Sequence, residues 1–190
     1  MLKNICVYCA SSNLVAPAFF AATQRLGELL AQHNYTLVYG GGNVGLMGAL
    51  ARAVHGQGGR VVGVIPEALR AKEVAYLPAD ELVITSDLRE RKAVMQARAD
   101  AFIALPGGFG TLEEVFEILT SKQLGFHEAP IVFVNTESYY QPLFDFFEHI
   151  YHRRFAKPEH RELCRLVDSP EAALHYLQYY KPGNVPDKLS

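Results

Sequence analysis

The chain alternates short apolar runs with amphipathic stretches of helical periodicity along nearly its whole length. Seven runs resemble strands, at residues 4–10, 36–40, 60–66, 81–85, 100–107, 130–135 and 164–169. Helical patterns lie between or after them, at residues 19–33, 46–57, 88–99, 111–124, 140–154 and 170–180. Because the strand-like runs are continuously apolar, both faces of each strand are expected to be covered. The sequence therefore predicts an α/β fold: a doubly wound parallel sheet of about seven strands between two layers of helices.

Length and composition favour one ordinary globular domain. The chain has 190 residues, which we expect to form a single domain over residues 1–180 and a flexible C-terminal tail over residues 181–190. The net charge of −2 gives no electrostatic drive toward nucleic acid or an anionic membrane. No apolar run reaches the roughly 18 residues that a membrane span requires. The expected partners are small molecules or protein.

The cysteines indicate a reducing, cytoplasmic location. There are three, an odd number, and Cys6 and Cys9 form a C-x-x-C pattern. Redox pairs of this spacing normally open a helix, whereas these two lie within a strand-like run and would point to opposite faces of the sheet. We expect them to be buried apolar side chains, with a redox pair as the alternative.

The first glycine-rich loop, "VYGGGNVGLMG", follows a strand and opens a helix. Gly40, Gly42 and Gly45 match G-x-G-x-x-G, whose free helix N–H groups favour a phosphate. Gly41, Gly42 and Met47 are the expected substrate contacts here. A glycine-rich turn without a ligand is the alternative. Glu67, 22 residues after Gly45, also leaves open an NAD-binding carboxylate.

The second glycine-rich loop, "LPGGFGTLEE", also lies between a strand and a helix. Pro106 should end the strand, Gly107, Gly108 and Gly110 free the backbone, and Thr111 could cap the helix. Glu114 then has two interpretations: the carboxylate of a capping box with Thr111, or a catalytic group. The helix dipole would keep it ionised, which suits a base or a charge stabiliser. Glu113 is counted among the substrate-binding residues, with contacts to solvent or to the residues that surround the substrate.

Two cations fall on a helix face that should be apolar. Arg91 and Lys92 follow Leu88 by three and four residues, within a stripe that continues to Met95 and Ala99. Inward-facing cations are costly unless a negative group meets them. They either extend to solvent at the edge of the helix or meet a ligand phosphate or Glu114. The seven histidines show no metal-ligand spacing, so no metal is expected.

These motifs together resemble the Lonely Guy family of cytokinin riboside 5'-monophosphate phosphoribohydrolases. The similarity runs from Cys6 to about Phe155 and rests on "VYGGGNVGLMG", "RERKAVM", "LPGGFGTLEE", "LGFHEAP" and "NTESYYQPL". The resemblance implies a Rossmann-like fold and hydrolysis of the N-glycosidic bond of adenosine 5'-monophosphate, often with an N6-prenyl group. It implies no cofactor. It also implies a homodimer whose partner subunit contributes to each site. Members were long labelled lysine decarboxylases, a chemistry that this sequence does not support.

The resemblance also assigns roles by position. Arg91 and Glu114 match the catalytic pair. The matched substrate contacts are Glu73, Lys92, Thr120 and the loop residues Gly108, Phe109, Gly110, Thr111 and Leu112. Leu88-Arg89 and Ser121 depart from a frequent Met-His and a frequent Trp, which bears on base preference.

The position of Glu114 after a phosphate-binding loop suits the hydrolysis of a nucleotide. Breaking the bond between ribose and base develops positive charge on the sugar, which Glu114 would stabilise. The alternative is a Rossmann-type carrier that binds a nucleotide or cofactor without hydrolysing it. Arg91 and Glu114 on opposite sides of one cleft would favour the enzyme.

Overall fold

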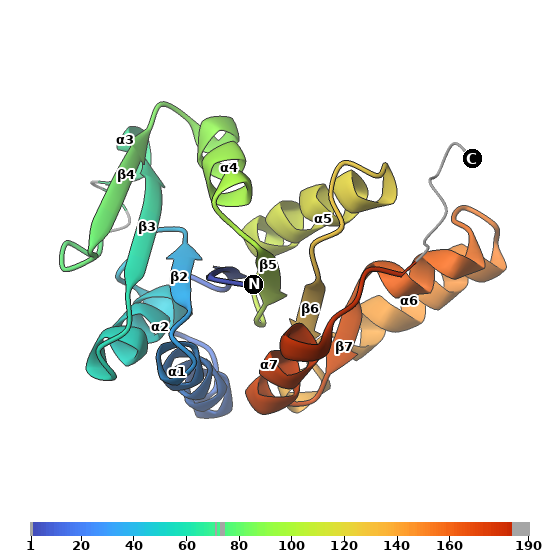
Figure 1. Ribbon diagram of the computed structural model, residues 1–190, viewed down its shortest axis with the longest axis horizontal. Coiled ribbons are helices and arrows are strands. Elements are labelled where there is room, and N and C mark those ends of the chain that lie inside the picture. Colours follow the sequence, from blue (N-terminus) through green and yellow to red (C-terminus); the bar gives the residue numbers. More distant parts are fainter. Residues whose placement is uncertain (1, 71, 73–74, 184–190) are drawn as a thin grey trace.

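The fold is a parallel sheet with helices on both faces (Figure 1). The computed structural model describes residues 2–70, 72 and 75–183. Within this part of the chain, seven strands are hydrogen-bonded in the order β4-β3-β2-β1-β5-β6-β7, and every pairing is parallel. The strands are β1 (Asn4–Tyr8), β2 (Thr36–Tyr39), β3 (Val61–Pro66), β4 (Glu81–Thr85), β5 (Ala101–Ala104), β6 (Ile131–Val134) and β7 (Arg165–Val167). Each corresponds to a predicted run, so the predicted fold class is confirmed.

The six predicted helices are also present. The helices are α1 (Pro17–Gln32), α2 (Gly45–Gly56), α3 (Glu67–Arg70), α4 (Leu88–Ala97), α5 (Phe109–Gln123), α6 (Gln141–His152) and α7 (Pro170–Tyr179), with 3₁₀ helices η1 (Thr136–Ser138) and η2 (Pro158–Leu163). The sequence did not predict α3, η1 or η2, because segments this short carry no readable periodicity. Among the described residues, no helix combines the length and apolar character needed to cross a membrane.

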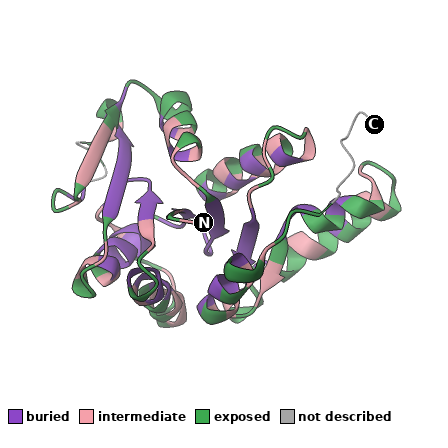
Figure 2. Ribbon diagram, in the orientation of Figure 1, coloured by how far each residue is buried: buried purple, intermediate pink, exposed green. Residues whose placement is uncertain are grey.

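Two hydrophobic cores flank the sheet, and Figure 2 shows its central strands as buried. One core packs the sheet against α1, α2 and α7, and the other packs it against α4, α5 and α6. Cys9 belongs to the first core and Cys6 to the second. Both are buried free thiols whose pKa is raised by desolvation. The expectation of two buried side chains on opposite faces is confirmed.

The chain reverses direction across the sheet next to β1. It runs outward from β1 to β4, then returns to place β5 on the other side of β1. The loops that leave β1 and β5 therefore diverge, which is where ligands bind in sheets of this type. A hydrogen bond from Ala10 N to Pro106 O, 3.3 Å, joins these two loops at their start.

The end of the chain carries no further element in the described part. Residues 181–183 are exposed and form neither helix nor strand. Residues 184–190 of the predicted tail lie outside the described residues.

Candidate active site

A cavity of about 420 Å³ opens where β1 and β5 diverge. Its walls come from the end of β1, both glycine-rich loops, α4 and the start of α5. The lining residues are Val7, Tyr8, Cys9, Ala10, Ser11, Ser12, Gly40, Met47, Arg91, Gly108, Phe109, Gly110, Thr111 and Glu114. The cavity therefore brings together the two predicted catalytic residues, most of the second loop and one side chain of the first loop.

Helix α5 presents its first backbone amides to this cavity. The helix begins at Phe109 with Gly108 as its N-cap, and its first internal hydrogen bond joins Leu112 N to Gly108 O at 3.0 Å. No described residue accepts a hydrogen bond from the amides of Phe109, Gly110 or Thr111. A side-chain carbon added to Gly108 or Gly110 would meet nothing within 4 Å. These amides, at the positive end of the helix dipole, form a natural anion site.

Thr111 does not cap α5, contrary to the capping-box interpretation. It lies in the first turn, because the helix starts two residues before it, and it is only 4% exposed. Its hydroxyl packs over Gly107, where an added Cβ would lie 2.1 Å from Thr111 Oγ1. Glu114 is therefore one turn inside the helix and cannot complete a capping box with Thr111.

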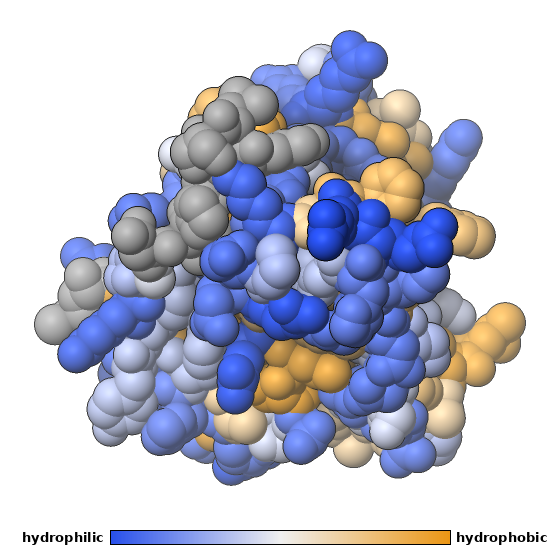
Figure 3. Space-filling model, turned by 90° about the vertical axis from the view of Figure 1, so that its right-hand side faces the viewer, coloured by the Kyte–Doolittle hydropathy of each residue, from blue (hydrophilic) through white to orange (hydrophobic). Residues whose placement is uncertain are grey.

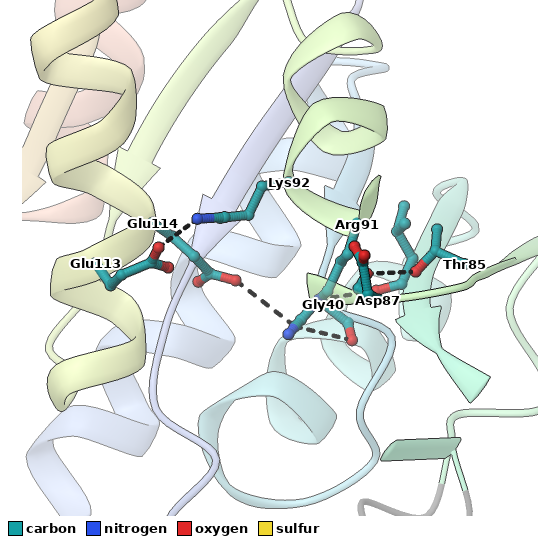
Figure 4. Close-up of polar contacts among 8 residues, drawn as sticks. Gly40, Thr85, Asp87, Arg91, Lys92, Glu113 and Glu114 are labelled. Atoms are coloured by element: carbon teal, nitrogen blue, oxygen red, sulfur yellow. Dashed lines mark hydrogen bonds and ion pairs between the residues drawn. The ribbon is translucent and has the colours of Figure 1, made fainter. Parts of the chain in front are cut away.

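Arg91 is buried beside Glu114, contrary to the interpretation in which it extends to solvent (Figure 4). Its Nε donates to Val64 O at 3.1 Å and its Nη2 donates to Gly40 O at 3.2 Å. Nη2 also lies 3.7 Å from Glu114 Oε1. The charged group on the inward face of α4 thus meets a carboxylate and two carbonyls, which offsets its desolvation.

Local structure places Arg91 in this position. Asp87 caps α4 by accepting hydrogen bonds from Arg89 N and Glu90 N, both at 2.8 Å. Gly40 leaves room for the guanidinium, because a Cβ there would lie 1.9 Å from Arg91 Nη2. Leu88 was predicted to lie on the apolar, inward face of α4. This prediction is wrong, because Leu88 is in the first turn of the helix and is 53% exposed.

Lys92 and Glu113 lie beside the cavity and do not line it. Lys92 Nζ pairs with Glu113 and, at 2.5 Å, with Glu117 Oε2. These carboxylates raise the pKa of Lys92. The three charges tie α4 to α5, and Figure 4 shows Lys92 and Glu113 pointing toward each other. Lys92 was expected to meet a phosphate or Glu114, and in this structure its nearest partners are Glu113 and Glu117.

The first three amides of α2, at the end of the first glycine loop, are already hydrogen-bonded. Asn13 Oδ1 accepts from Gly45 N at 2.9 Å, and Ala10 O accepts from Leu46 N and Met47 N at 3.0 and 3.3 Å. The expectation that the N-terminus of α2 is open to a phosphate is therefore wrong. The sequence pattern did not reveal that the loop after β1 reaches these amides.

The other predicted contacts of the first loop do not line the cavity. Gly41 O accepts from Tyr76 N, and Gly42 forms an isolated bridge with Ala75, so both glycines pair with the segment that precedes β4. Glu67 is exposed and paired with Arg70 at 3.1 Å on α3, and it does not line the cavity. NAD binding at this loop would need free amides at the start of α2 and the Glu67 carboxylate in the cavity. The amides are hydrogen-bonded and Glu67 lies outside the cavity, so the structure does not support this interpretation.

Of the three remaining predicted contacts, the two that lie in the described part of the chain do not line the cavity. Leu112 packs against the core between the sheet and α5. Thr120 lines a separate groove between α5 and α6. Glu73 lies outside the described residues.

The wall formed by the end of β1 was not predicted from the sequence. Tyr8 and Cys9 are buried there, and Ser11 and Ser12 follow in the loop. Burial raises the pKa of Tyr8, so its hydroxyl stays protonated. The signal was present, because "YCASS" spans the carboxyl end of a central strand, where parallel sheets place their ligands. Among the described residues, no three His, Cys, Asp or Glu side chains are grouped closely enough to hold a metal ion.

Comparison with known proteins agrees with this architecture. Residues 47–177 match the family model described as "Possible lysine decarboxylase". The chain is 41% identical over 180 residues to the cytokinin riboside 5'-monophosphate phosphoribohydrolase LOG7 of Arabidopsis thaliana, covering 95% of this chain and 83% of the relative. It is also 41% identical to the probable cytokinin riboside 5'-monophosphate phosphoribohydrolase LOGL2 of Oryza sativa subsp. japonica, covering 95% and 74%. The resemblance noted from the motifs is confirmed.

Solved structures share the fold at lower identity. The molybdenum cofactor binding protein from Rippkaea orientalis superposes with a TM-score of 0.70 at 22% identity, covering 94% of this chain and 96% of that one. The molybdenum cofactor carrier protein from Chlamydomonas reinhardtii gives a TM-score of 0.70 at 19% identity, covering 94% and 97%. At this identity the likeness concerns the fold alone.

Proposed function

The chain belongs to the cytokinin riboside 5'-monophosphate phosphoribohydrolase family, and we propose that it hydrolyses the N-glycosidic bond of adenosine 5'-monophosphate or of an N6-substituted riboside 5'-monophosphate. The products are the free base and ribose 5-phosphate. The observation that carries this proposal is the position of Glu114 and Arg91 in one cavity with the open amides of α5.

The phosphate is assigned to the N-terminus of α5. The amides of Phe109, Gly110 and Thr111 point to the same end of the helix, and the dipole favours a dianion there. Glu114 follows Thr111 by three residues, which is about 4.5 Å along the helix axis. A nucleotide whose phosphate sits on these amides would therefore bring its ribose beside the carboxylate.

Glu114 acts on the sugar and on water. As the bond between C1' and the base breaks, positive charge develops on the ribose, and a nearby carboxylate stabilises it. The C1'–N bond breaks and its electron pair leaves with the base, whose freed nitrogen takes up one proton from solvent. Water adds its oxygen to C1' and gives one proton to Glu114, which returns it to solvent, so that one water is consumed overall. Arg91 orients the carboxylate, since two carbonyls fix the guanidinium independently.

A carrier that only binds its ligand accounts less well for this arrangement. A carboxylate next to the bound sugar adds negative charge where a phosphate ligand already supplies it. Pairing with Arg91 offsets part of this cost in the free protein. Positive charge that develops on the sugar during a reaction gives the carboxylate a use that binding alone does not.

We also propose a homodimer with the site near the subunit interface. A groove of about 410 Å³ between α5 and α6 is lined largely by aromatic and aliphatic side chains, including Phe116, Phe146 and Phe155. Phe146 and Phe155 are 57% and 81% exposed, and Figure 3 shows hydrophobic side chains on the face of the molecule that carries α6. Exposed apolar surface of this kind is typical of a contact with another chain. Thr120 in this groove would then reach a site through the interface.

A reducing, cytoplasmic location is part of the same proposal. It is supported by three buried cysteines that form no disulfide.

Incubation of the purified protein with AMP and with N6-isopentenyladenosine monophosphate tests the proposal. Chromatography should detect free base and an equal amount of ribose 5-phosphate from at least one of them. Tight binding of both nucleotides without release of base would reject hydrolysis and favour the carrier.

A further inference from the structure

Two adjacent tyrosines between β6 and α6 hold carbonyl groups of the second glycine-rich loop. Tyr139 Oη donates to Gly107 O and Tyr140 Oη donates to Leu105 O, both at 2.7 Å. Neither tyrosine lines the cavity of the candidate active site. The two hydroxyls therefore contact the backbone of the loop from outside the cavity.

The turn that carries these tyrosines has a strained backbone. Glu137 and Ser138 have φ values of +54° and +56°, a region that costs free energy for residues other than glycine. The side chain of Asn135, which is buried, accepts from Tyr140 N at 2.8 Å, and its backbone N–H donates to Val167 O at 2.7 Å. Strain of this kind persists where surrounding contacts determine the conformation. The ends of β6 and β7 therefore fix the position of the tyrosine pair.

The hydrogen bond from Tyr139 sets the orientation of one peptide group. In a trans peptide, which this one is, the carbonyl and the following N–H point in opposite directions. Because Gly107 O is turned toward Tyr139, the N–H of Gly108 points away from it. Gly108 lines the cavity whereas Gly107 does not, and no described residue accepts a hydrogen bond from Gly108 N. The Gly108 N–H is thus directed at the cavity, beside the open amides of α5.

A peptide group between two glycines rotates easily. Half a turn would exchange the N–H and the carbonyl oxygen at little conformational cost, because glycine adopts positive and negative φ alike. The carbonyl oxygen of Gly107 would then face the cavity and repel an anion. The Leu105–Pro106 peptide differs, because proline has no N–H to direct. Of the two hydroxyls, that of Tyr139 alone therefore orients a donor.

We propose that Tyr139 is a positioning residue whose hydroxyl holds the Gly107 carbonyl away from the cavity and so directs the Gly108 N–H at the phosphate of the ligand. The inference rests on the proposed function, because it takes the start of α5 as the phosphate site. It adds one backbone donor to the amides already assigned to the phosphate.

Two matched variants test this inference in a Glu114→Gln background, which prevents turnover during calorimetric titration. Tyr139→Phe should weaken the binding of AMP and of ribose 5-phosphate equally, by about tenfold, because both carry the phosphate that loses a donor. The melting temperature should stay within ~2 °C, since the ring is 45% exposed and still packs against Phe19 and Tyr140.

Tyr140→Phe should have the opposite effects. It removes a buried hydrogen bond, so the melting temperature should fall by ~3 °C or more. The affinity for AMP should stay within twofold of the background, because Leu105 N still donates to Tyr8 O and Pro106 O still accepts from Ala10 N. Equal losses of affinity in the two variants would show that both tyrosines only support the loop, and would overturn the inference.

Two further results would also overturn it: an AMP affinity in Tyr139→Phe within twofold of the background, or a loss for AMP that ribose 5-phosphate does not share. A crystal structure of the background variant with AMP gives an independent measurement. A phosphate oxygen within hydrogen-bond distance of Gly108 N is expected, and Gly107 O facing the phosphate would contradict the proposal.

Failure of this inference is distinguishable from failure of the proposed function, because binding does not depend on base release. A protein that shows the expected affinities yet releases no base from AMP would reject the proposed function and leave the role of Tyr139 standing. Base release by the parent, with unchanged AMP affinity in Tyr139→Phe, would do the reverse.

Discussion

Arg91 Nη2 lies 3.7 Å from Glu114 Oε1, while the same guanidinium donates to the carbonyls of Val64 and Gly40 at 3.1 and 3.2 Å. The side chains of both residues are largely buried, with 9% and 13% of their surface exposed. Backbone carbonyls cannot change their protonation state, so Arg91 keeps its place whether Glu114 is ionised or protonated. This is the arrangement that a carboxylate needs if it is to accept a proton and return to its starting state.

Glu114→Gln should abolish base release without unfolding the protein. Glutamine keeps the shape of the side chain but can neither stabilise positive charge as strongly nor accept a proton. We expect kcat to fall by ~10²–10³-fold, a loss of ~2.7–4 kcal/mol of transition-state stabilisation. Free base released from AMP is the measurement. Glu113→Gln on the exposed side of α5 is the control, and a Glu114→Gln variant within tenfold of the original rate would contradict the assignment.

Gly40→Ala should displace Arg91. The new Cβ would lie 1.9 Å from Nη2, so the guanidinium must leave Gly40 O and move away from Glu114. A displaced buried charge destabilises the fold, and we expect the free energy of unfolding to fall by ~2–4 kcal/mol with loss of activity. Thermal and chemical denaturation measure this. Gly56→Ala, where an added Cβ meets nothing within 4 Å at the end of α2, should be neutral or stabilising.

Gly110→Ala should weaken substrate binding without lowering the stability of the protein. An added Cβ meets nothing within 4 Å in the protein, so the melting temperature should not fall. It would, however, occupy space next to the amides assigned to the phosphate, and KM should rise at least ~10-fold. Steady-state kinetics beside a melting curve provide the measurement. An unchanged KM would mean that the phosphate lies elsewhere.

Phe146→Glu should weaken the proposed dimer. The exposed ring lies on α6 in the aromatic groove, and a carboxylate there would be desolvated by a second subunit. Sedimentation should show a shift toward monomer at micromolar concentration, with reduced activity if the interface completes the site. Phe126→Glu is the comparison: this ring is 76% exposed but does not line the groove, so no shift is expected. A monomeric parent protein would reject the dimer itself.

The sequence predicted the sheet and the central charges because both depend on short-range patterns. Continuous apolar runs require burial on both faces, and Arg91 on an apolar stripe required a negative partner, which Glu114 provides. Helix α3 was too short to show periodicity. The start of α5 was placed two residues late, because Thr111 is a common cap and Gly108 caps only through its backbone.

Contacts between distant loops could not be predicted in this way. The oxygen atoms that fill the start of α2 come from Ala10 and Asn13, more than thirty residues earlier in the chain. The pairing of Lys92 with Glu113 and Glu117 likewise depends on how α4 and α5 are positioned. A local motif shows which groups a loop could bind, whereas its accessibility is decided by tertiary packing.

Lys122→Met should change how stability depends on pH. Lys122 is buried on α5, where its Nζ donates to Tyr180 Oη at 3.0 Å and lies 5.0 Å from the centre of that ring. Desolvation lowers its pKa from 10.5 to about 8, with Cys164 and Glu128 as the nearby acidic groups. Between these values the unfolded chain holds more protons than the folded one. The free energy of unfolding of the parent should therefore rise with pH across this window, by up to ~3 kcal/mol from this group.

The methionine variant removes that contribution, so it should gain stability relative to the parent below pH 8 and lose this advantage by about pH 10. Urea denaturation at pH 7, 8, 9 and 10 measures the difference between the two proteins, which cancels the titration of tyrosines common to both. Lys3→Met, at an exposed position, is the matched control and should show a flat difference. A flat difference for Lys122→Met as well would mean that hydrogen bonding to Tyr180 compensates fully for the burial of the ammonium group.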